Sequence, residues 1–188
     1  MTVSQAAKMP PKMPPLRFVR SVLNSFSKDS GLEPRKQCMG FYDWVEMMAH
    51  RLTQLQFRVT AASVGKVEFE LAIQKEHTNR LQTIHGGTLA SLVDLGGSLA
   101  VASKGRFMTG VSTDINVTYL NPGGTPGDIM TGTAICDKMG RTLAYTTVQF
   151  FNKKGELAAR GSHTKYIAKT WASEDFVAPE EYVAEEEK

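Results

Sequence analysis

Apolar and polar side chains alternate most clearly in residues 55–73. Apolar residues such as Val67 and Phe69 are separated there by single charged residues, a two-residue period that predicts a strand with one buried face. Gly65 marks a turn within these residues, directly before the alternating positions, so residues 55–73 are predicted to form a β-hairpin. In residues 40–53 the apolar side chains instead recur at helical spacing, which predicts a helix.

A run of small and apolar residues predicts one long helix over about 87–103. This helix is too rich in glycine and alanine to have one solvated face, and Gly96 and Gly97 indicate close approach by another backbone. Four short β runs joined by glycine-containing turns follow, in residues 108–121, 129–138, 141–152 and 157–167. The order predicts an antiparallel meander in a sheet that wraps around the single helix.

The composition is that of an ordinary globular protein. The chain has 188 residues, of which 41% are hydrophobic and 22% charged, enough for one domain with a real core. No apolar run is long enough to span a bilayer. The two cysteines, Cys38 and Cys136, fit no metal-ligand spacing, so no metal site is expected and a reducing compartment is indicated.

Charge divides the chain into a predicted basic N-terminal tail (1–35), one domain (36–167) and an acidic C-terminal tail (168–188). Residues 1–28 carry five basic residues and no acid, whereas the C-terminal tail carries seven acids and two bases. The acidic tail is expected to be disordered or loosely packed. No basic stripe with interleaved aromatic residues occurs, so nucleic-acid binding is not expected.

The N-terminal segment can be interpreted in two ways. It lacks acids, contains arginine and serine, and has an amphipathic pattern in LRFVRSVLNSFS, features typical of a mitochondrial transit peptide. Alternatively it is a mobile basic tail that targets nothing. The expected location is accordingly mitochondrial or cytoplasmic, with the mitochondrion favoured.

One acid interrupts the apolar helix. Asp94 shares a narrow polar face with Ser91 and Ser98, three residues before it and four after it. A partly buried carboxylate requires either an altered protonation equilibrium or specific hydrogen bonds. On its own, such an acid is more often solvated or bound by a backbone amide.

The sequence His85-Gly86-Gly87 precedes this helix. The first N–H groups of a helix lack intrahelical partners, and glycines let a ligand approach them closely. Together with the helix dipole, these N–H groups suit an oxygen that gains negative charge. Alone the motif is a weak signal, because glycine before a helix is common and a histidine there more often caps or packs.

Three stretches together resemble the hotdog-fold acyl-CoA thioesterases: EHTNRLQTIHGGTLASLVDLGG (76–97), GVSTDINVTYLNP (110–122) and residues 140–167. The resemblance covers about residues 55–167 and is to the branch of thioesterase superfamily member 2 (acyl-CoA thioesterase 13) and the phenylacetic-acid-degradation thioesterases. It implies an α+β hotdog fold, in which a curved antiparallel sheet wraps a long central helix. It also implies homodimers with shared active sites, which associate into homotetramers.

The resemblance assigns a role to each candidate residue. Asp94 of one subunit would be the general base or nucleophile, and Ser112 would help it to orient water. From the other subunit, the Gly86 N–H and the Asn79 side chain would polarise the thioester carbonyl. His85 would support the thioester site or hold Asn79. Taken singly, Asn79 and Ser112 are more often an Asx-turn and a strand hydroxyl.

The expected substrate is a fatty or aryl acyl-CoA, so coenzyme A belongs to the substrate and no separate cofactor is expected. Gly87 is predicted to contact substrate. Basic residues at turns and strand ends are candidates for the phosphates of coenzyme A: Lys138, Arg141, Lys153, Lys154, Arg160 and Lys165. Arg141 and Lys165 are favoured among them, although each is more often an ordinary solvated charge.

Two rival functions fit the same fold. An acyl-thioester dehydratase is disfavoured, because such enzymes have prolines around their histidine that IHGGTLASL lacks. A non-catalytic acyl-CoA-binding or sensing protein would keep the pocket, but it would not need Asp94 and Ser112. Hydrolysis of the acyl-CoA thioester to free acid and coenzyme A is therefore predicted.

Overall fold

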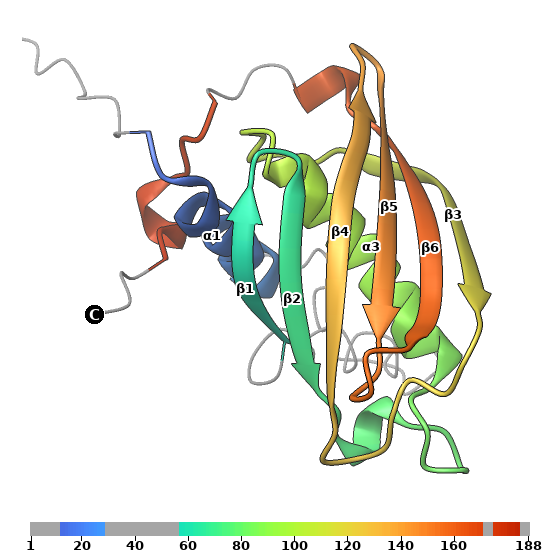
Figure 1. Ribbon diagram of the computed structural model, residues 1–188. Coiled ribbons are helices and arrows are strands. Elements are labelled where there is room, and N and C mark those ends of the chain that lie inside the picture. The colour runs from blue at the N-terminus through green and yellow to red at the C-terminus, as the bar shows by residue number, and fades with distance from the viewer. Residues whose placement is uncertain (1–11, 29–56, 171–174, 185–188) are drawn as a thin grey trace, which may run out of the picture.

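The computed structural model describes residues 12–28, 57–170 and 175–184. One six-stranded antiparallel sheet curves around a long helix (Figure 1). Its strands are β1 (Phe57–Ser63), β2 (Lys66–Ala72), β3 (Val111–Tyr119), β4 (Ile129–Met139), β5 (Leu143–Phe151) and β6 (Leu157–Tyr166). The helices are α1 (Pro15–Lys28) and α3 (Gly86–Ala102), with short 3₁₀ turns η1 (Lys75–His77), η2 (Ala168–Thr170) and η3 (Glu180–Tyr182).

The hotdog fold expected from the resemblance is confirmed, as are the hairpin β1–β2 and the long helix α3. The helix predicted over 40–53 lies outside the described residues.

The strand order is β1-β2-β4-β5-β6-β3, and the sheet does not close on itself. The prediction of a four-strand meander is wrong for β3, which pairs with β6 and not with β4. The reason is the long breaker segment 120–128, which carries the chain across the sheet instead of making a tight hairpin.

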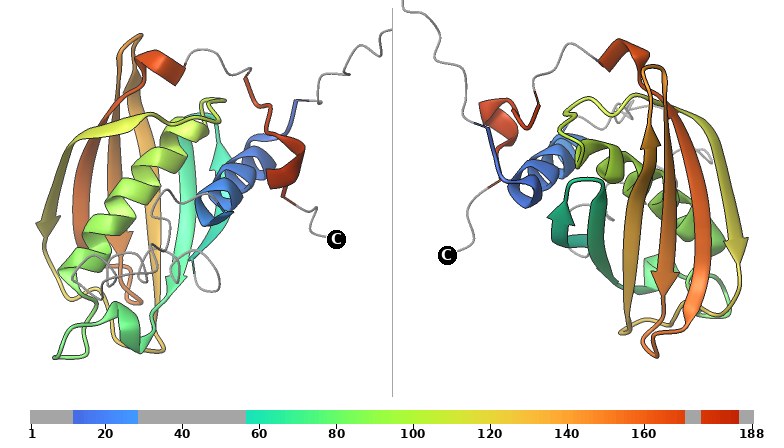
Figure 2. Two further views of the ribbon diagram at one scale, coloured as in Figure 1. Left: turned by 180° about the vertical axis from the view of Figure 1, so that it is seen from behind. Right: turned by 45° about the horizontal axis from the view of Figure 1, so that its top comes forward.

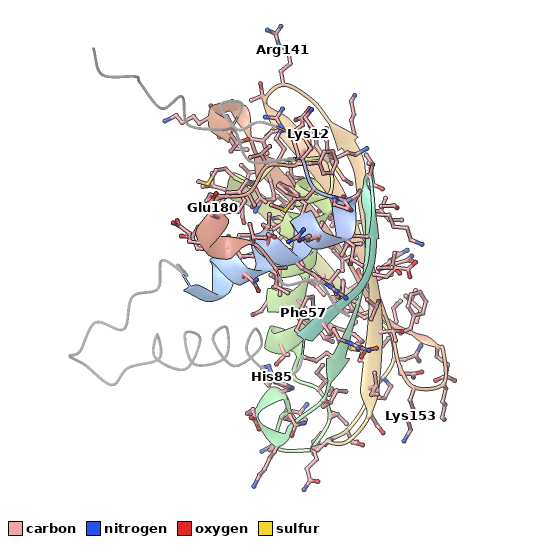
Figure 3. All side chains as sticks on the ribbon, turned by 90° about the vertical axis from the view of Figure 1, so that its left-hand side faces the viewer. Lys12, Phe57, His85, Arg141, Lys153 and Glu180 are labelled. Carbon is pink, nitrogen blue, oxygen red and sulfur yellow. The ribbon has the colours of Figure 1, made fainter. Side chains whose placement is uncertain are left out.

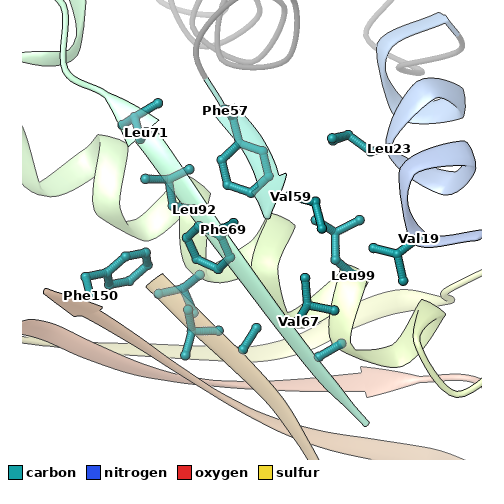
Figure 4. Close-up of a cluster of buried hydrophobic side chains, with 14 of the residues drawn as sticks. Val19, Leu23, Phe57, Val59, Val67, Phe69, Leu71, Leu92, Leu99 and Phe150 are labelled. Atoms are coloured by element: carbon teal, nitrogen blue, oxygen red, sulfur yellow. The ribbon is translucent and has the colours of Figure 1, made fainter. Parts of the chain in front are cut away.

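The core lies between α3 and the concave face of the sheet. Val67, Phe69 and Leu71 of β2 are all buried, as their alternation predicted. The Phe69 ring lies 4.9 Å from the ring of Phe57 and 6.0 Å from that of Phe150, beneath the buried face of α3 (Figure 4). This apolar layer fixes α3 against the sheet and therefore determines which strands its polar residues meet.

Close approach between the helix and the sheet is sharpest at Gly97. A Cβ atom added at this position would lie 2.5 Å from Nδ1 of His163 and 2.6 Å from Oγ1 of Thr146. Any larger residue would push α3 away from β5 and β6. The glycine thus brings the middle of α3 directly against β6.

The two ends of the described chain pack together, and we term α1 with residues 175–184 the terminal clasp (Figure 2). Phe18, Val19 and Val22 of α1 are fully buried. Arg17 Nε donates to the Ala184 carbonyl (3.1 Å), and the Ala184 N–H donates to Ser21 Oγ (3.0 Å).

This packing differs from the loose tails expected from charge. In α1 the apolar residues recur on one helical face, and that pattern outweighs the basic composition. At the other end, residues 175–184 pack on α1 despite their acids, with Ala178 fully buried. In the described parts of the chain, no helix is long and apolar enough to cross a membrane.

Candidate active site

Asp94 lies midway along α3, where the helix meets β3 and β6. Its Oδ1 accepts a hydrogen bond from Ser112 Oγ at 3.2 Å. The Nε2 atom of His163 lies 2.9 Å from Ser112 Oγ and 3.4 Å from Asp94 Oδ1. Lys165 completes the group, which we term the Asp94 cluster, with its Nζ 4.0 Å from Asp94 Oδ1.

Strand pairing explains how these residues meet. Ser112 of β3 is the register partner of Lys165 on β6, and the register shifts directly afterwards, between Ser112 and Asp114. The predicted association of Asp94 with Ser112 therefore has a geometric basis in the β3–β6 pair. The side chain of Asp94 remains 51% exposed, so its carboxylate is open to a ligand or to water.

His163 and Lys165 were not among the predicted catalytic residues. The sequence nevertheless contained a signal for them, because Gly161, His163 and Lys165 occupy alternate, buried positions of one strand. Ionisable side chains at inward positions are rare without a functional or pairing reason. Alternation alone could not say that β6 lies beside Asp94.

His163 is neutral around neutral pH. Burial and the charge of Lys165 lower its pKa to about 4, against the opposing effect of Asp94. Within the described residues its Nδ1 has no hydrogen-bond partner, so the single proton of the neutral ring can lie on Nε2 and be donated to Ser112 Oγ. The imidazole is thus a neutral neighbour of Ser112 Oγ and not a counter-charge to Asp94.

The cluster is not a serine-hydrolase triad. In such a triad the acid binds Nδ1 of the histidine and the serine binds Nε2. Here Asp94 and Ser112 both lie on the Nε2 side of His163. The arrangement instead presents a carboxylate oriented by a hydroxyl, which suits a general base acting on water.

A second group of polar atoms lies at the start of α3. His85 is the N-cap, and its Nδ1 accepts from the Gly87 N–H at 2.8 Å. Tyr119 of β3 donates its hydroxyl to the Gly86 carbonyl at 2.9 Å. The Gly86 N–H itself donates to no acceptor within the described residues. A backbone donor is therefore directed outward at the positive end of the helix.

Asn79 is held beside this helix start by an Asx-turn. Its Oδ1 accepts from the Leu81 N–H (2.8 Å), and its Nδ2 donates to Thr83 Oγ1 (3.0 Å). The His85 N–H donates to the His77 carbonyl, which ties the Asn79 loop to α3. An amide nitrogen has two hydrogens, so Asn79 can still donate one. We term Asn79 and Gly86 the helix-start pair.

The two groups are too far apart to act on one substrate bond within one chain. Gly86 and Asp94 are eight residues apart on the same helix, which places them about 12 Å apart along its axis. A reacting carbon must lie within about 3 Å of both its base and its oxyanion donors. Each group could therefore serve only as one half of a site that two chains share, and we term the two groups half-sites.

The predicted phosphate contacts lie in different places. Lys165 is only 3% exposed, and its ammonium is directed at Ser98 and Asp94, which gives a phosphate contact no support. Arg141 is exposed at the end of the sheet opposite His85 (Figure 3). Across residues 12–28, 57–170 and 175–184, no cluster of three or more metal-binding side chains occurs.

Comparison with known proteins agrees with this fold. Residues 81–159 match the Thioesterase superfamily. The chain is 41% identical over 152 residues to a putative esterase of Schizosaccharomyces pombe, across 81% of this chain and 84% of that protein. It is 43% identical over 110 residues to human acyl-coenzyme A thioesterase 13, across 58% of this chain and 78% of that protein.

Solved structures give the same result. Zebrafish thioesterase superfamily member 2 superimposes with a TM-score of 0.62 and 35% identity, over 80% of this chain and 96% of that one. A hypothetical thioesterase protein of Streptococcus pneumoniae, crystallised with coenzyme A, has a TM-score of 0.56 and 25% identity, over 60% of this chain and 89% of that one. The fold and these relatives thus define a hotdog-fold hydrolase. The chain belongs to the thioesterase superfamily.

Proposed function

We propose that this chain hydrolyses a fatty or aryl acyl-CoA to the free acid and coenzyme A. The observation that carries the proposal is the half-exposed Asp94 carboxylate, which Ser112 orients. On the same helix, the first N–H, that of Gly86, donates to no acceptor within the described residues. The human relative is named an acyl-coenzyme A thioesterase, and the pneumococcal structure holds coenzyme A. Both support a coenzyme A ester as the substrate class.

The chemistry follows from the two half-sites. Asp94 takes a proton from a water molecule, whose oxygen attacks the thioester carbonyl carbon. The Gly86 N–H and the Asn79 amide donate to the developing oxyanion. The carbon–sulfur bond then breaks, and the proton passes from Asp94 to the departing thiolate. The alternative, direct attack by the Asp94 carboxylate, would label the aspartate with ¹⁸O from water in a single turnover.

The 12 Å gap between the half-sites is the reason to propose a homodimer. Two copies that join their β3 strands would form one continuous sheet and place Asp94 of one copy near the helix-start pair of the other. β3 is an edge strand that exposes Val111, Ile115 and Tyr119. A homotetramer is proposed from the family resemblance, and exposed Ile135 and Tyr145 supply apolar side chains on other strands.

Arg141 and Gly87 remain proposed substrate contacts. Antiparallel pairing of two β3 edges turns one copy end over end, which brings the Arg141 end of one copy toward the helix start of the other.

For location, we propose mitochondrial targeting by residues 1–35. A reporter carrying that segment which stays in the cytosol would overturn the targeting proposal.

The deciding experiment measures free thiol released from acyl-CoAs of graded chain length and from an aryl acyl-CoA. Purified wild-type protein is expected to release coenzyme A, and the best substrate identifies the acyl group. Asp94→Asn is expected to remove release without loss of fold or self-association. A wild-type protein that binds acyl-CoA but releases no thiol would instead be the non-catalytic sensor.

A further inference from the structure

Tyr119 is the last residue of β3, and its side chain reaches the first residue of α3. Its hydroxyl donates to the Gly86 carbonyl at 2.9 Å. The end of the strand is itself held by β6, because Tyr119 is the register partner of Ala159 and the Leu120 N–H donates to the Ala158 carbonyl at 2.9 Å. The tyrosine is thus directed from a fixed strand end at a backbone group of the helix.

The ring of Tyr119 also packs directly against Gly86. A Cβ atom added at Gly86 would lie 3.2 Å from Cζ of the ring and 3.4 Å from its hydroxyl oxygen. These distances are shorter than ordinary van der Waals contacts, so the lack of a side chain at Gly86 is what lets the ring come this close. The hydroxyl and the ring of one side chain therefore hold the same backbone unit.

The contacts around Gly86 leave its N–H directed outward. The His85 N–H donates to the His77 carbonyl at 2.8 Å, and the Gly87 N–H donates to Nδ1 of His85 at 2.8 Å. The Gly86 carbonyl accepts from Tyr119, whereas the Gly86 N–H donates to no acceptor among the described residues. The backbone on both sides of this N–H is therefore fixed, and Tyr119 supplies the part of that support that comes from β3.

We propose that Tyr119 is a positioning residue of the thioesterase site, which holds the Gly86 N–H in the direction of the substrate carbonyl. The inference rests on the proposed function, in which that N–H donates to the developing oxyanion. Such a donor stabilises the charge only if its direction is fixed in advance, and a displacement of about 1 Å can cost about 100-fold in rate. Tyr119 acts through Gly86, because its one hydroxyl proton is already donated to the Gly86 carbonyl.

The test compares Tyr119→Phe, which keeps the ring and removes the hydroxyl, with Tyr145→Phe, the same change at an exposed tyrosine of β5. Two quantities are measured: acyl-CoA turnover, and the infrared C=O band of a bound ketone analogue of acyl-CoA, in which a methylene group replaces the sulfur. Tyr119→Phe is expected to lower kcat about tenfold with little change in KM. Its C=O band is expected to move toward that of the free analogue, because a misdirected N–H polarises the carbonyl less. Tyr145→Phe is expected to match the wild type in both measurements.

Each outcome decides the proposal. An unchanged C=O band in Tyr119→Phe overturns it, and so does a raised KM at unchanged kcat, which would make Tyr119 a direct substrate contact. Light scattering shows whether Tyr119→Phe still associates. If it does not, Gly86→Ala decides: it keeps the hydroxyl but presses a methyl group against the ring, so its band should also move, and an unmoved band overturns the inference. A wild-type protein that binds the analogue but releases no thiol from acyl-CoA refutes the proposed hydrolysis, and the band alone then decides the role of Tyr119.

Discussion

The two edge strands of the sheet, β1 and β3, differ in whether another part of the chain covers them. At β1 the terminal clasp covers the edge, and Arg20 donates to the Val59 carbonyl through Nη2 at 2.9 Å and Nε at 3.3 Å. At β3 the outer side is exposed, and Val111 is 64% and Tyr119 53% exposed. An open strand edge is a template for pairing with another chain. The β3 edge is therefore the edge at which the proposed association is expected.

The open edge is also the one that serves both half-sites. Ser112, near the start of β3, contacts Asp94, and Tyr119, at its end, contacts Gly86. The covered edge contacts neither group. Pairing at β3 thus has a consequence for chemistry that pairing at β1 would lack.

The largest expected effect tests whether the half-sites come from different chains. Asp94→Asn should lower kcat by about 10³-fold or more, and Asn79→Ala by about 10- to 1000-fold, because one removes the base and the other an oxyanion donor. When the two variants are unfolded and refolded together, hybrid dimers hold one intact site. Mixed protein should recover roughly a quarter of wild-type thiol release, from random pairing of two chains.

Refolding each variant alone is the control for this mixing experiment. Recovery only in the mixture supports a shared site. A mixture that stays as inactive as its components would place both half-sites on one chain.

A charge on the open edge should have the next largest effect. Ile115→Lys on β3 is expected to give a monomer by light scattering and to lower kcat/KM by at least about 10²-fold, since lysine blocks edge pairing and leaves each half-site incomplete. Thr60→Lys, on the exposed side of β1, is the matched control. Full activity in a monomeric Ile115→Lys protein would contradict the comparison of the two edges.

Ser112→Ala should lower kcat by about tenfold or somewhat more, because the Asp94 carboxylate loses the hydroxyl donor that orients it. KM should change little. Burst kinetics supply the sharper readout: a serine nucleophile would give an acyl-enzyme burst in the wild type and complete inactivity in the variant. Either result would require a different mechanism.

At the covered edge the expected effect is on stability rather than on turnover. Phe18 is fully buried, with the rings of Phe107 and Phe176 6.5 and 5.5 Å away. Phe18→Ala should lower the free energy of unfolding by about 3–5 kcal/mol, measured by urea denaturation. Turnover per folded molecule should be nearly unchanged at a temperature where the variant is folded.

The smallest effect concerns pH. The pKa of His163 is lowered from 6.5 to about 4 in the folded protein. Between these values the unfolded chain binds a proton that the folded chain does not, so stability should fall as the pH drops from 6.5 to 4. His163→Gln should flatten this dependence in denaturation curves. Some dependence should remain, because burial also lowers the pKa of His77.

Local signals in the sequence were sufficient for the elements but not for their partners. The alternation around Phe69 and the Gly65 turn predicted the first hairpin, and the small-residue run predicted α3. Strand pairing across long loops is set by the packed core, so β3 was assigned to the wrong neighbour. The same non-local pairing brings His163 and Lys165 to Asp94, which explains why His163 was missed and why Lys165 was predicted as a phosphate contact instead.

The amphipathic pattern of the N-terminal segment was recognised, but its packing on the domain was not predicted, for a different reason. Its charges were weighed above its apolar face, although Phe18, Val19 and Val22 lie on one side of a helix. The partner of that face is in part residues 175–184, far away in the sequence. No local pattern could predict this contact.

The terminal clasp also bears on how the molecule can be extended. Met13 and Phe176 are joined by a backbone hydrogen bond of 3.0 Å, so the two ends of the described chain meet on the β1 side of the sheet (Figures 1 and 2). A group attached directly at residue 12 or residue 184 would start on the β1 side of the sheet, away from β3. Attachment at these positions is therefore expected to leave the β3 edge accessible, whereas an insertion in the loop after β3 is expected to lie beside that edge.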